Sequence, residues 1–132
     1  NDSETQIIDY KGKKILIVDD NNVSVKILIR ILEKYNINID SATSGEECIN
    51  KIKSEKKYDL IIMDHIMKKL DGIQTFKVLK SIKDYKLPPV IILTANSAAN
   101  LKNTYLKEGV SDYISKPVNL KELDKLLKKY LK

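Results

Sequence analysis

Short apolar runs and longer amphipathic stretches alternate five times along the chain. The apolar runs are rich in β-branched residues and predict strands at residues 14–19, 38–42, 60–64, 90–94 and 112–114. The stretches that follow them carry apolar residues at helical spacing and predict helices at residues 22–35, 45–56, 72–83, 98–107 and 120–131. This alternation is typical of an α/β domain in which helices cover both faces of a parallel sheet.

Residues that start and stop helices stand at the predicted helix ends. Ser44, with Glu47 three residues later, is typical of a capping box, and Asn119 fits the start of the last helix. Asp71 directly precedes the third helix and can cap it through its carboxylate. Gly109 is expected to end the fourth helix, because glycine readily adopts the left-handed conformation found there.

Charged and hydroxyl side chains follow the apolar strands. The strand ends carry an acidic pair, a third carboxylate, a hydroxyl and an ammonium, namely Asp19, Asp20, Asp64, Thr94 and Lys116. In open α/β sheets, ligands bind beyond the carboxyl ends of the strands. Carboxylate oxygens suit Mg²⁺, and an ammonium with a hydroxyl suits phosphoryl oxygens. We therefore expect one site that holds a divalent cation and a phosphoryl group.

Taken singly, these residues have simpler interpretations. Asp19 and Asp20, followed by Asn21, also fit a turn that caps the next helix. Asp64 alone would fit a loop cap, as well as a metal ligand or a nucleophile that forms an aspartyl phosphate. His65, the only histidine, is expected to be an exposed loop side chain beside the site rather than a relay or a base. The coincidence of five suitable groups at strand ends favours the shared site.

Length and composition argue against several other classes of protein. A chain of 132 residues fits one domain. The net charge is +6, and all but one of the 24 basic residues are Lys. These lysines are spread over every predicted helix, which favours a solvated surface over a nucleic-acid site. The single Cys48 excludes an intrachain disulfide and fits a reducing compartment. Because no apolar run could span a membrane and no signal peptide is recognisable, we expect a cytoplasmic domain.

The strand-end residues form a set that resembles a known family. The residues Asp19-Asp20, Met63-Asp64-x-x-Met67, Asp71-Gly72, Thr94-Ala95 and Lys116-Pro117 are similar to the motifs of the receiver domain of bacterial two-component response regulators. The resemblance covers residues 13–131. It implies a flavodoxin-like (CheY-like), doubly wound (βα)5 fold with a five-stranded parallel sheet in the order 2-1-3-4-5.

The resemblance also implies a phosphorylation chemistry. In the family, the aspartate at the position of Asp64 accepts phosphate from a phosphohistidine on a histidine kinase or a histidine phosphotransfer domain, and small phosphodonors can also serve. Asp20, Asp64 and the backbone carbonyl of Ile66 would bind Mg²⁺, with Asp19 acting through a water. Thr94 and Lys116 would hold the phosphoryl oxygens.

A conformational switch is implied as well. Phosphorylation would draw the Thr94 hydroxyl toward the phosphate, and Tyr113 would rotate inward to fill the vacated space. The face formed by residues 98–107, 112–114 and 120–131 would be remodelled. The peptide bond before Pro117 is expected to be cis, and we also consider a phosphorylation-dependent dimer.

Three positions stand out against the family pattern. Lys68 stands where the family usually has proline, so we expect a more mobile loop there. Ile66 and Asn96 stand where the family tunes the lifetime of the phosphate. Ile66 offers no polar side chain to orient an attacking water.

Two other classes of protein share parts of the pattern. A phosphatase of the haloacid dehalogenase type needs a second aspartate two residues after the nucleophile, where this chain has Ile66. A flavodoxin-like electron carrier needs a phosphate-binding loop rich in Ser, Thr and Gly after the first strand. The carboxylates of Asp19 and Asp20 would repel that phosphate, so a signalling domain is favoured over both alternatives.

Residues 1–12 are polar, show no strand or helix period, and are interpreted as a linker before a receiver domain at 13–132. The segment 9–14 resembles the linker before a C-terminal receiver in hybrid sensor histidine kinases. We therefore expect a hybrid kinase as the parent protein, which can be membrane-anchored. The alternative is a response regulator that stands alone or continues into a DNA-binding domain. The receiver itself is expected to contact neither nucleic acid nor membrane.

Overall fold

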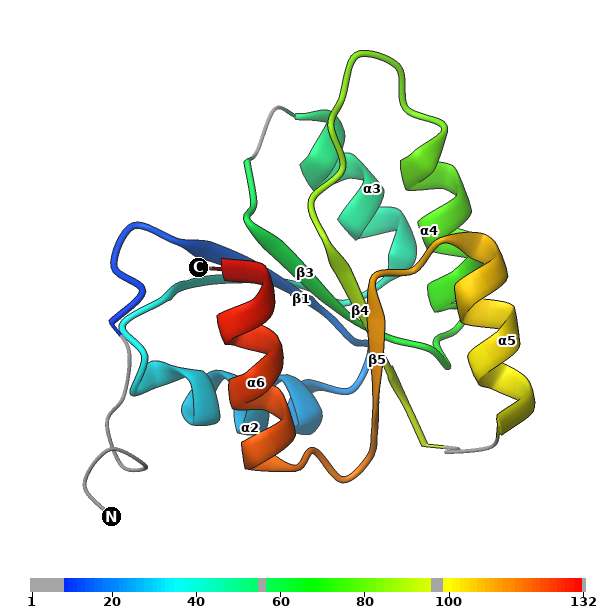
Figure 1. Ribbon diagram of the computed structural model, residues 1–132. Helices are drawn as coiled ribbons and strands as arrows, with labels where there is room; N and C mark the ends of the chain where they lie inside the picture. Colours follow the sequence, from blue (N-terminus) through cyan, green and yellow to red (C-terminus); the bar gives the residue numbers. More distant parts are fainter. Residues whose placement is uncertain (1–8, 55–56, 96–98, 132) are drawn as a thin grey trace.

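The computed structural model describes residues 9–54, 57–95 and 99–131. At its centre is a parallel sheet in the order β2-β1-β3-β4-β5 (Figure 1), which confirms the predicted fold. The strands are β1 (Lys14–Val18), β2 (Asn38–Ala42), β3 (Leu60–Asp64), β4 (Val90–Thr94) and β5 (Asp112–Ser115). The helices are α2 (Asn22–Glu33), α3 (Gly45–Lys53), α4 (Gly72–Lys80), α5 (Ala99–Glu108) and α6 (Leu120–Leu131). In these segments we find no helix of the length and apolarity needed to cross a membrane.

Side chains of the central strands alternate between two core layers. In β1, Ile15 and Ile17 pack into the layer under α2 and α6, whereas Leu16 and Val18 pack into the layer under α3, α4 and α5 (Figure 1). Every residue of β3 and β4 is buried. Helices on both faces thus explain the continuous apolar runs of these strands and leave their carboxyl ends free to form a site.

Several elements end a few residues from the predicted positions, for local reasons. β1 ends at Val18 rather than Asp19, because the Asp19 carboxylate accepts a hydrogen bond from the backbone N–H of Asn21 and begins the turn into α2. α2 ends at Glu33 rather than 35, because the chain turns at Asn36 with φ of 58°. Four other elements also end at residues that differ from the predicted ones, namely α3 at Lys53, α4 at Lys80, α5 at Glu108 and β5 at Ser115. Residues 55, 56 and 98 of the predicted helices lie outside the described residues.

The predicted helix caps are confirmed, with one difference at α3. The Ser44 hydroxyl accepts a hydrogen bond from the backbone N–H of Glu47 at 3.0 Å. The Glu47 carboxylate, however, accepts from the backbone N–H of Thr43 at 2.7 Å, one residue before the position that a capping box requires. The remaining predicted caps and stop are in place at Asp71, Asn119 and Gly109.

The end of the segment interpreted as a linker packs against the domain. Tyr10 is buried in the layer under α2 and α6, and its backbone N–H donates to the carbonyl of Tyr35 at 2.9 Å. The two tyrosine rings lie 5.9 Å apart. Packing therefore begins before residue 13, while residues 1–8 lie outside the described part of the chain.

A polar network links β2 to its neighbours through Asp40. Its carboxylate accepts hydrogen bonds from the Tyr58 hydroxyl at 2.6 Å and from the Lys51 ammonium at 3.0 Å. Burial by itself raises the pKa of Asp40, but the hydrogen bonds from Tyr58, Lys51 and the backbone N–H of Ser41 outweigh it and lower the pKa below its ordinary 3.8. Asp40 therefore stabilises the fold above that pH and loses this contribution as the pH falls through its lowered pKa.

Replacing Asp40 tests this pH dependence. We expect Asp40→Asn to lower the free energy of unfolding by about 1 kcal/mol at neutral pH, because a charge-assisted network is weakened. The difference from the wild type should shrink as the pH falls through the lowered pKa of Asp40, because the wild-type carboxyl then also becomes neutral. Urea unfolding at a series of pH values measures it, with the exposed Asp84→Asn as control. A difference that stays constant with pH would contradict the assignment.

Candidate functional site

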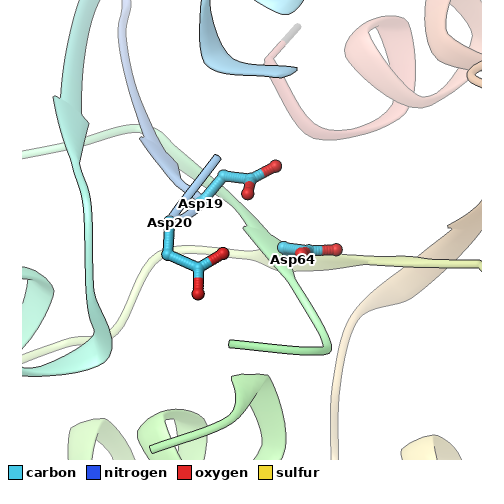
Figure 2. A group of neighbouring side chains, drawn as sticks. All are labelled: Asp19, Asp20 and Asp64. Carbon is cyan, nitrogen blue, oxygen red and sulfur yellow. The ribbon is translucent and has the colours of Figure 1, made fainter. Parts of the chain in front are cut away.

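Three carboxylates meet where β1 and β3 end (Figure 2). Asp19 and Asp20 directly follow β1, and Asp64 is the last residue of β3. Ligand oxygens of the three lie within 4.8 Å of one another. Asp19 and Asp64 are only 3% and 7% exposed, whereas Asp20 is exposed to solvent. The predicted convergence of these carboxylates is therefore present.

Negative charge is concentrated in this partly buried place. Burial raises the pKa of Asp19 above its ordinary value, and the charges of Asp64 and Asp20 raise it further. The hydrogen bond from the backbone N–H of Asn21, at 2.9 Å, and the charge of Lys116 act in the opposite direction. A hard divalent cation would relieve this repulsion through oxygen ligands. The donor set therefore fits a metal such as Mg²⁺.

Lys116 reaches the cluster from the end of β5. Its Nζ lies 2.7 Å from Asp64 Oδ1 and 3.9 Å from Asp19 Oδ2. Its backbone N–H donates to the carbonyl of Thr94 at 2.7 Å, which extends the pairing of β4 with β5. The peptide bond to Pro117 is cis, as the family resemblance implied. The ammonium thus offsets part of the carboxylate charge, most directly at Asp64.

The start of α4 fixes the loop that follows Asp64. The backbone N–H of Gly72 donates to the carbonyl of His65 at 2.7 Å. A Cβ atom at residue 72 would lie 2.6 Å from the backbone oxygen of Asp64 and 3.0 Å from the Cα of His65. Only glycine allows this close approach of two backbones. The Asp71-Gly72 pair of the sequence pattern thus helps to hold Asp64 in place.

The loop after β3 is tied to the acidic pair at Lys68. Its backbone N–H donates a hydrogen bond to Asp20 Oδ2 at 3.0 Å. Proline, which has no backbone N–H, could not form this bond. We expected this loop to be more mobile, but at Lys68 it is hydrogen-bonded directly to the site. The side chain of Ile66 is 69% exposed, and Asn96 lies outside the described residues.

Thr94 and Tyr113 lie on adjacent strands beside α5. Thr94, the last residue of β4, is 2% exposed and follows Leu93, the register partner of Asp64. Tyr113 is half-buried, and its ring centroid lies 5.5 Å from that of Tyr105 on α5. The structure therefore places Thr94 at the site edge and packs Tyr113 against α5.

The prediction that the His65 side chain is exposed was wrong. Its side chain is half-buried, and its Nδ1 lies 2.8 Å from the hydroxyl oxygen of Tyr105. The two rings meet edge to face with centroids 5.5 Å apart. Local sequence could not show this contact, because it joins residues 40 positions apart. Sequence reasoning also missed Tyr105, which follows the apolar pattern of its helix like an ordinary core residue.

Comparison with known proteins decides the family. The family model described as the response regulator receiver domain matches residues 15–128, which include the acidic cluster and Lys116. The chain belongs to the response regulator receiver domain family. Receiver domains belong to two-component systems, in which they interact with histidine kinases and phosphotransfer partners. The receiver fold and the function class predicted from the sequence are thereby confirmed.

This receiver domain resembles short parts of much longer proteins. It is 37% identical over 123 residues to Hybrid signal transduction histidine kinase L of Dictyostelium discoideum, covering 89% of this chain and 7% of that protein. It is 36% identical over 117 residues to Transcription factor SKN7 of Candida albicans, covering 89% and 20% respectively. The solved receiver domain of a Francisella response regulator has a TM-score of 0.81 and 32% identity, covering 91% of this chain and 97% of that one. The similarity therefore extends to bacterial and eukaryotic proteins.

Proposed function

We propose that Asp64 of this receiver domain accepts a phosphoryl group from a phosphohistidine of a partner protein. The observation that carries the proposal is the contact of Asp64 with Lys116 Nζ at 2.7 Å inside a cluster of three carboxylates. In the transfer, an Asp64 oxygen forms a bond to phosphorus while the P–N bond breaks, and the imidazole leaves with the bonding electron pair. Lys116 is placed to compensate the charge of the transferred group.

The acidic cluster is our proposed Mg²⁺ site. Asp20, Asp64 and the backbone carbonyl of Ile66 would bind the ion directly, and Asp19 would act through a water. The separation of the three carboxylates and the exposure of Asp20 support this proposal. When bound, Mg²⁺ supplies positive charge that stabilises a phosphoryl group on Asp64.

Thr94 and Tyr113 are the proposed switch residues. The Thr94 hydroxyl would move to a phosphoryl oxygen, and Tyr113 would rotate inward and change the face formed by α5, β5 and α6. The position of Thr94 directly after the register partner of Asp64 supports the first step. The half-buried state of Tyr113, packed on α5, supports the second. A phosphorylation-dependent dimer through this face is part of the proposal.

An apolar pocket beside the site supports docking of a helix that carries the phosphohistidine. The pocket has a volume of about 310 Å³ and borders on Asp19 and Lys116. Its apolar lining comes from α2, from β4 and from the residues after β5, namely Ile27, Leu28, Ile31, Leu93, Pro117 and Val118. On α2, Val23 and Ile27 are 65% and 57% exposed. Apolar residues of a partner helix could bury these side chains while its imidazole approaches Asp64.

A charged substitution at the edge of the pocket tests whether the partner helix docks there. We expect Ile27→Asp to slow transfer from a phosphorylated histidine phosphotransfer domain at least tenfold, because a carboxylate would be buried against apolar residues. Leu106→Asp is the matched control, since Leu106 is 62% exposed on α5. Rapid-quench measurement of the transfer rate checks this. Equal slowing by both variants would argue against docking at α2.

We further propose that the parent protein is a hybrid sensor histidine kinase, with residues 1–12 as a linker that packs on the domain at Tyr10, and 13–132 as the receiver. The similarity to a hybrid kinase supports this assignment. A response regulator that stands alone or continues into a DNA-binding domain is the second candidate, favoured by the similarity to a transcription factor. In either case we place the receiver in the cytoplasm, without direct contact to nucleic acid or membrane.

Phosphorylation by a small donor tests the function. The protein is incubated with acetyl phosphate, with and without Mg²⁺, and its intact mass is recorded. We expect one phosphoryl adduct that requires Mg²⁺ and is removed by hydroxylamine, as an acyl phosphate should be. If no adduct forms and beryllofluoride, a phosphoryl mimic, does not bind, the proposal is wrong.

A further inference from the structure

A buried tyrosine that the proposed function does not use contacts two of the strand ends. Tyr105, on α5, is only 1% exposed. Its hydroxyl lies 2.8 Å from Nδ1 of His65, directly after β3, and also forms a hydrogen bond with the side chain of Thr94, at the end of β4. A buried hydroxyl thus joins the residue after Asp64 to the proposed switch threonine.

The Tyr105 hydroxyl has two hydrogen-bond partners and one proton to donate. Burial raises the pKa of Tyr105, and the nearby carboxylates of Asp71 and Asp64 raise it further, whereas the hydrogen bond with Thr94 lowers it. Tyr105 is therefore protonated at neutral pH. When its oxygen accepts from Thr94, this proton is left for Nδ1 of His65.

The ring of Tyr105 extends this contact to the other proposed switch residue. It meets the His65 ring edge to face and the Tyr113 ring at a tilt of 44°, with centroids 5.5 Å apart in each pair. The same side chain therefore touches the loop after Asp64, Thr94 and Tyr113. The proposed movements of Thr94 toward the phosphoryl group and of Tyr113 inward would therefore both change the surroundings of Tyr105.

We propose that Tyr105 accepts a hydrogen bond from Thr94 and donates one to Nδ1 of His65. As a positioning residue it thereby keeps the Thr94 hydroxyl in its unphosphorylated position and sets how readily the domain switches. This inference rests on the proposed function, in which Thr94 donates to a phosphoryl oxygen on Asp64. A hydroxyl has one proton, so Thr94 cannot donate to Tyr105 and to that oxygen together. Phosphorylation must break the bond between Thr94 and Tyr105, and the strength of this bond opposes the switch.

Removing the hydroxyl while keeping the ring tests the proposal. We expect Tyr105→Phe to lower the dissociation constant of Mg²⁺-beryllofluoride by roughly fivefold, because one hydrogen bond no longer favours the resting state. The matched control is Tyr35→Phe, since the Tyr35 hydroxyl donates to Asp124 at 2.9 Å in the opposite core layer. Thermal unfolding of both variants shows whether they retain the fold.

Nitrogen NMR of the single histidine gives a second measurement, which the wild type alone can supply. We expect ¹⁵N shifts of the Nε2–H tautomer, with the Nδ1 shift of a nitrogen that accepts a hydrogen bond. Tyr105→Phe should move Nδ1 toward the shift of an unbonded acceptor, while Tyr35→Phe leaves it in place. A general loss of stability would not produce this selective change.

The outcomes separate the inference from the proposed function. Wild-type protein that binds beryllofluoride, with a Tyr105→Phe variant that binds equally well or more weakly, overturns the role of Tyr105 alone. A wild-type His65 spectrum that shows the Nδ1–H tautomer overturns it as well. Wild-type protein that does not bind beryllofluoride overturns the proposed function, and the role of Tyr105 with it.

Discussion

Asp64→Asn is expected to abolish phosphorylation by acetyl phosphate, with a loss of rate of at least about a hundredfold. The neutral amide is a much weaker nucleophile than the carboxylate, and the cluster also loses one of its three carboxylates. Intact mass spectrometry should show no adduct under conditions in which the wild type is modified. Peptide mapping of the wild-type adduct should place the phosphoryl group on Asp64.

A matched control makes this result specific to the site. Asp84→Asn also removes a carboxylate, but at an exposed turn with φ of 58°, a conformation that asparagine tolerates. This control should be phosphorylated at the wild-type rate. An adduct of equal yield in Asp64→Asn would mean that another residue accepts the phosphoryl group, and the assignment of Asp64 would fail.

Lys116→Met is expected to change Mg²⁺ binding and phosphorylation in opposite directions. Without the ammonium that lies 2.7 Å from Asp64, the carboxylates should bind Mg²⁺ more tightly, by several-fold up to roughly tenfold. Phosphorylation by acetyl phosphate should nevertheless slow at least tenfold, because the positive charge that compensates the phosphoryl oxygens is gone. Calorimetric titration with Mg²⁺ and intact mass spectrometry measure the two effects on the same preparation.

Lys125→Met provides the control for this pair of measurements, since Lys125 is an exposed lysine of α6. It should leave both properties near the wild-type values. If Lys116→Met weakened Mg²⁺ binding as well as phosphorylation, the lysine would serve mainly to hold the cluster together. A simple loss of structure would then be distinguished by thermal unfolding in the presence of Mg²⁺.

The order and type of the helices and strands could be predicted from the sequence alone. Buried parallel strands require continuous apolar runs, and the runs at Leu60–Asp64 and Val90–Thr94 could be recognised without any tertiary information. Caps such as Asp71 and Ser44 marked the helix starts, because they act on the next few backbone N–H groups. The alternation of strands and helices also determined which residues stand at strand ends. The acidic cluster and Lys116 were predictable for this reason.

Contacts between distant elements could be decided only by the tertiary structure. The N–H of Lys68 reaches Asp20 across 48 positions, and the His65 side chain is half-buried against Tyr105. The sequence near each of these residues is equally compatible with an exposed loop, since hydrophobic periodicity reports which face is buried but not which side chains meet there. The packing of α5 on the sheet selects the partner of each side chain. That packing joins Thr94 and His65 through one buried hydroxyl.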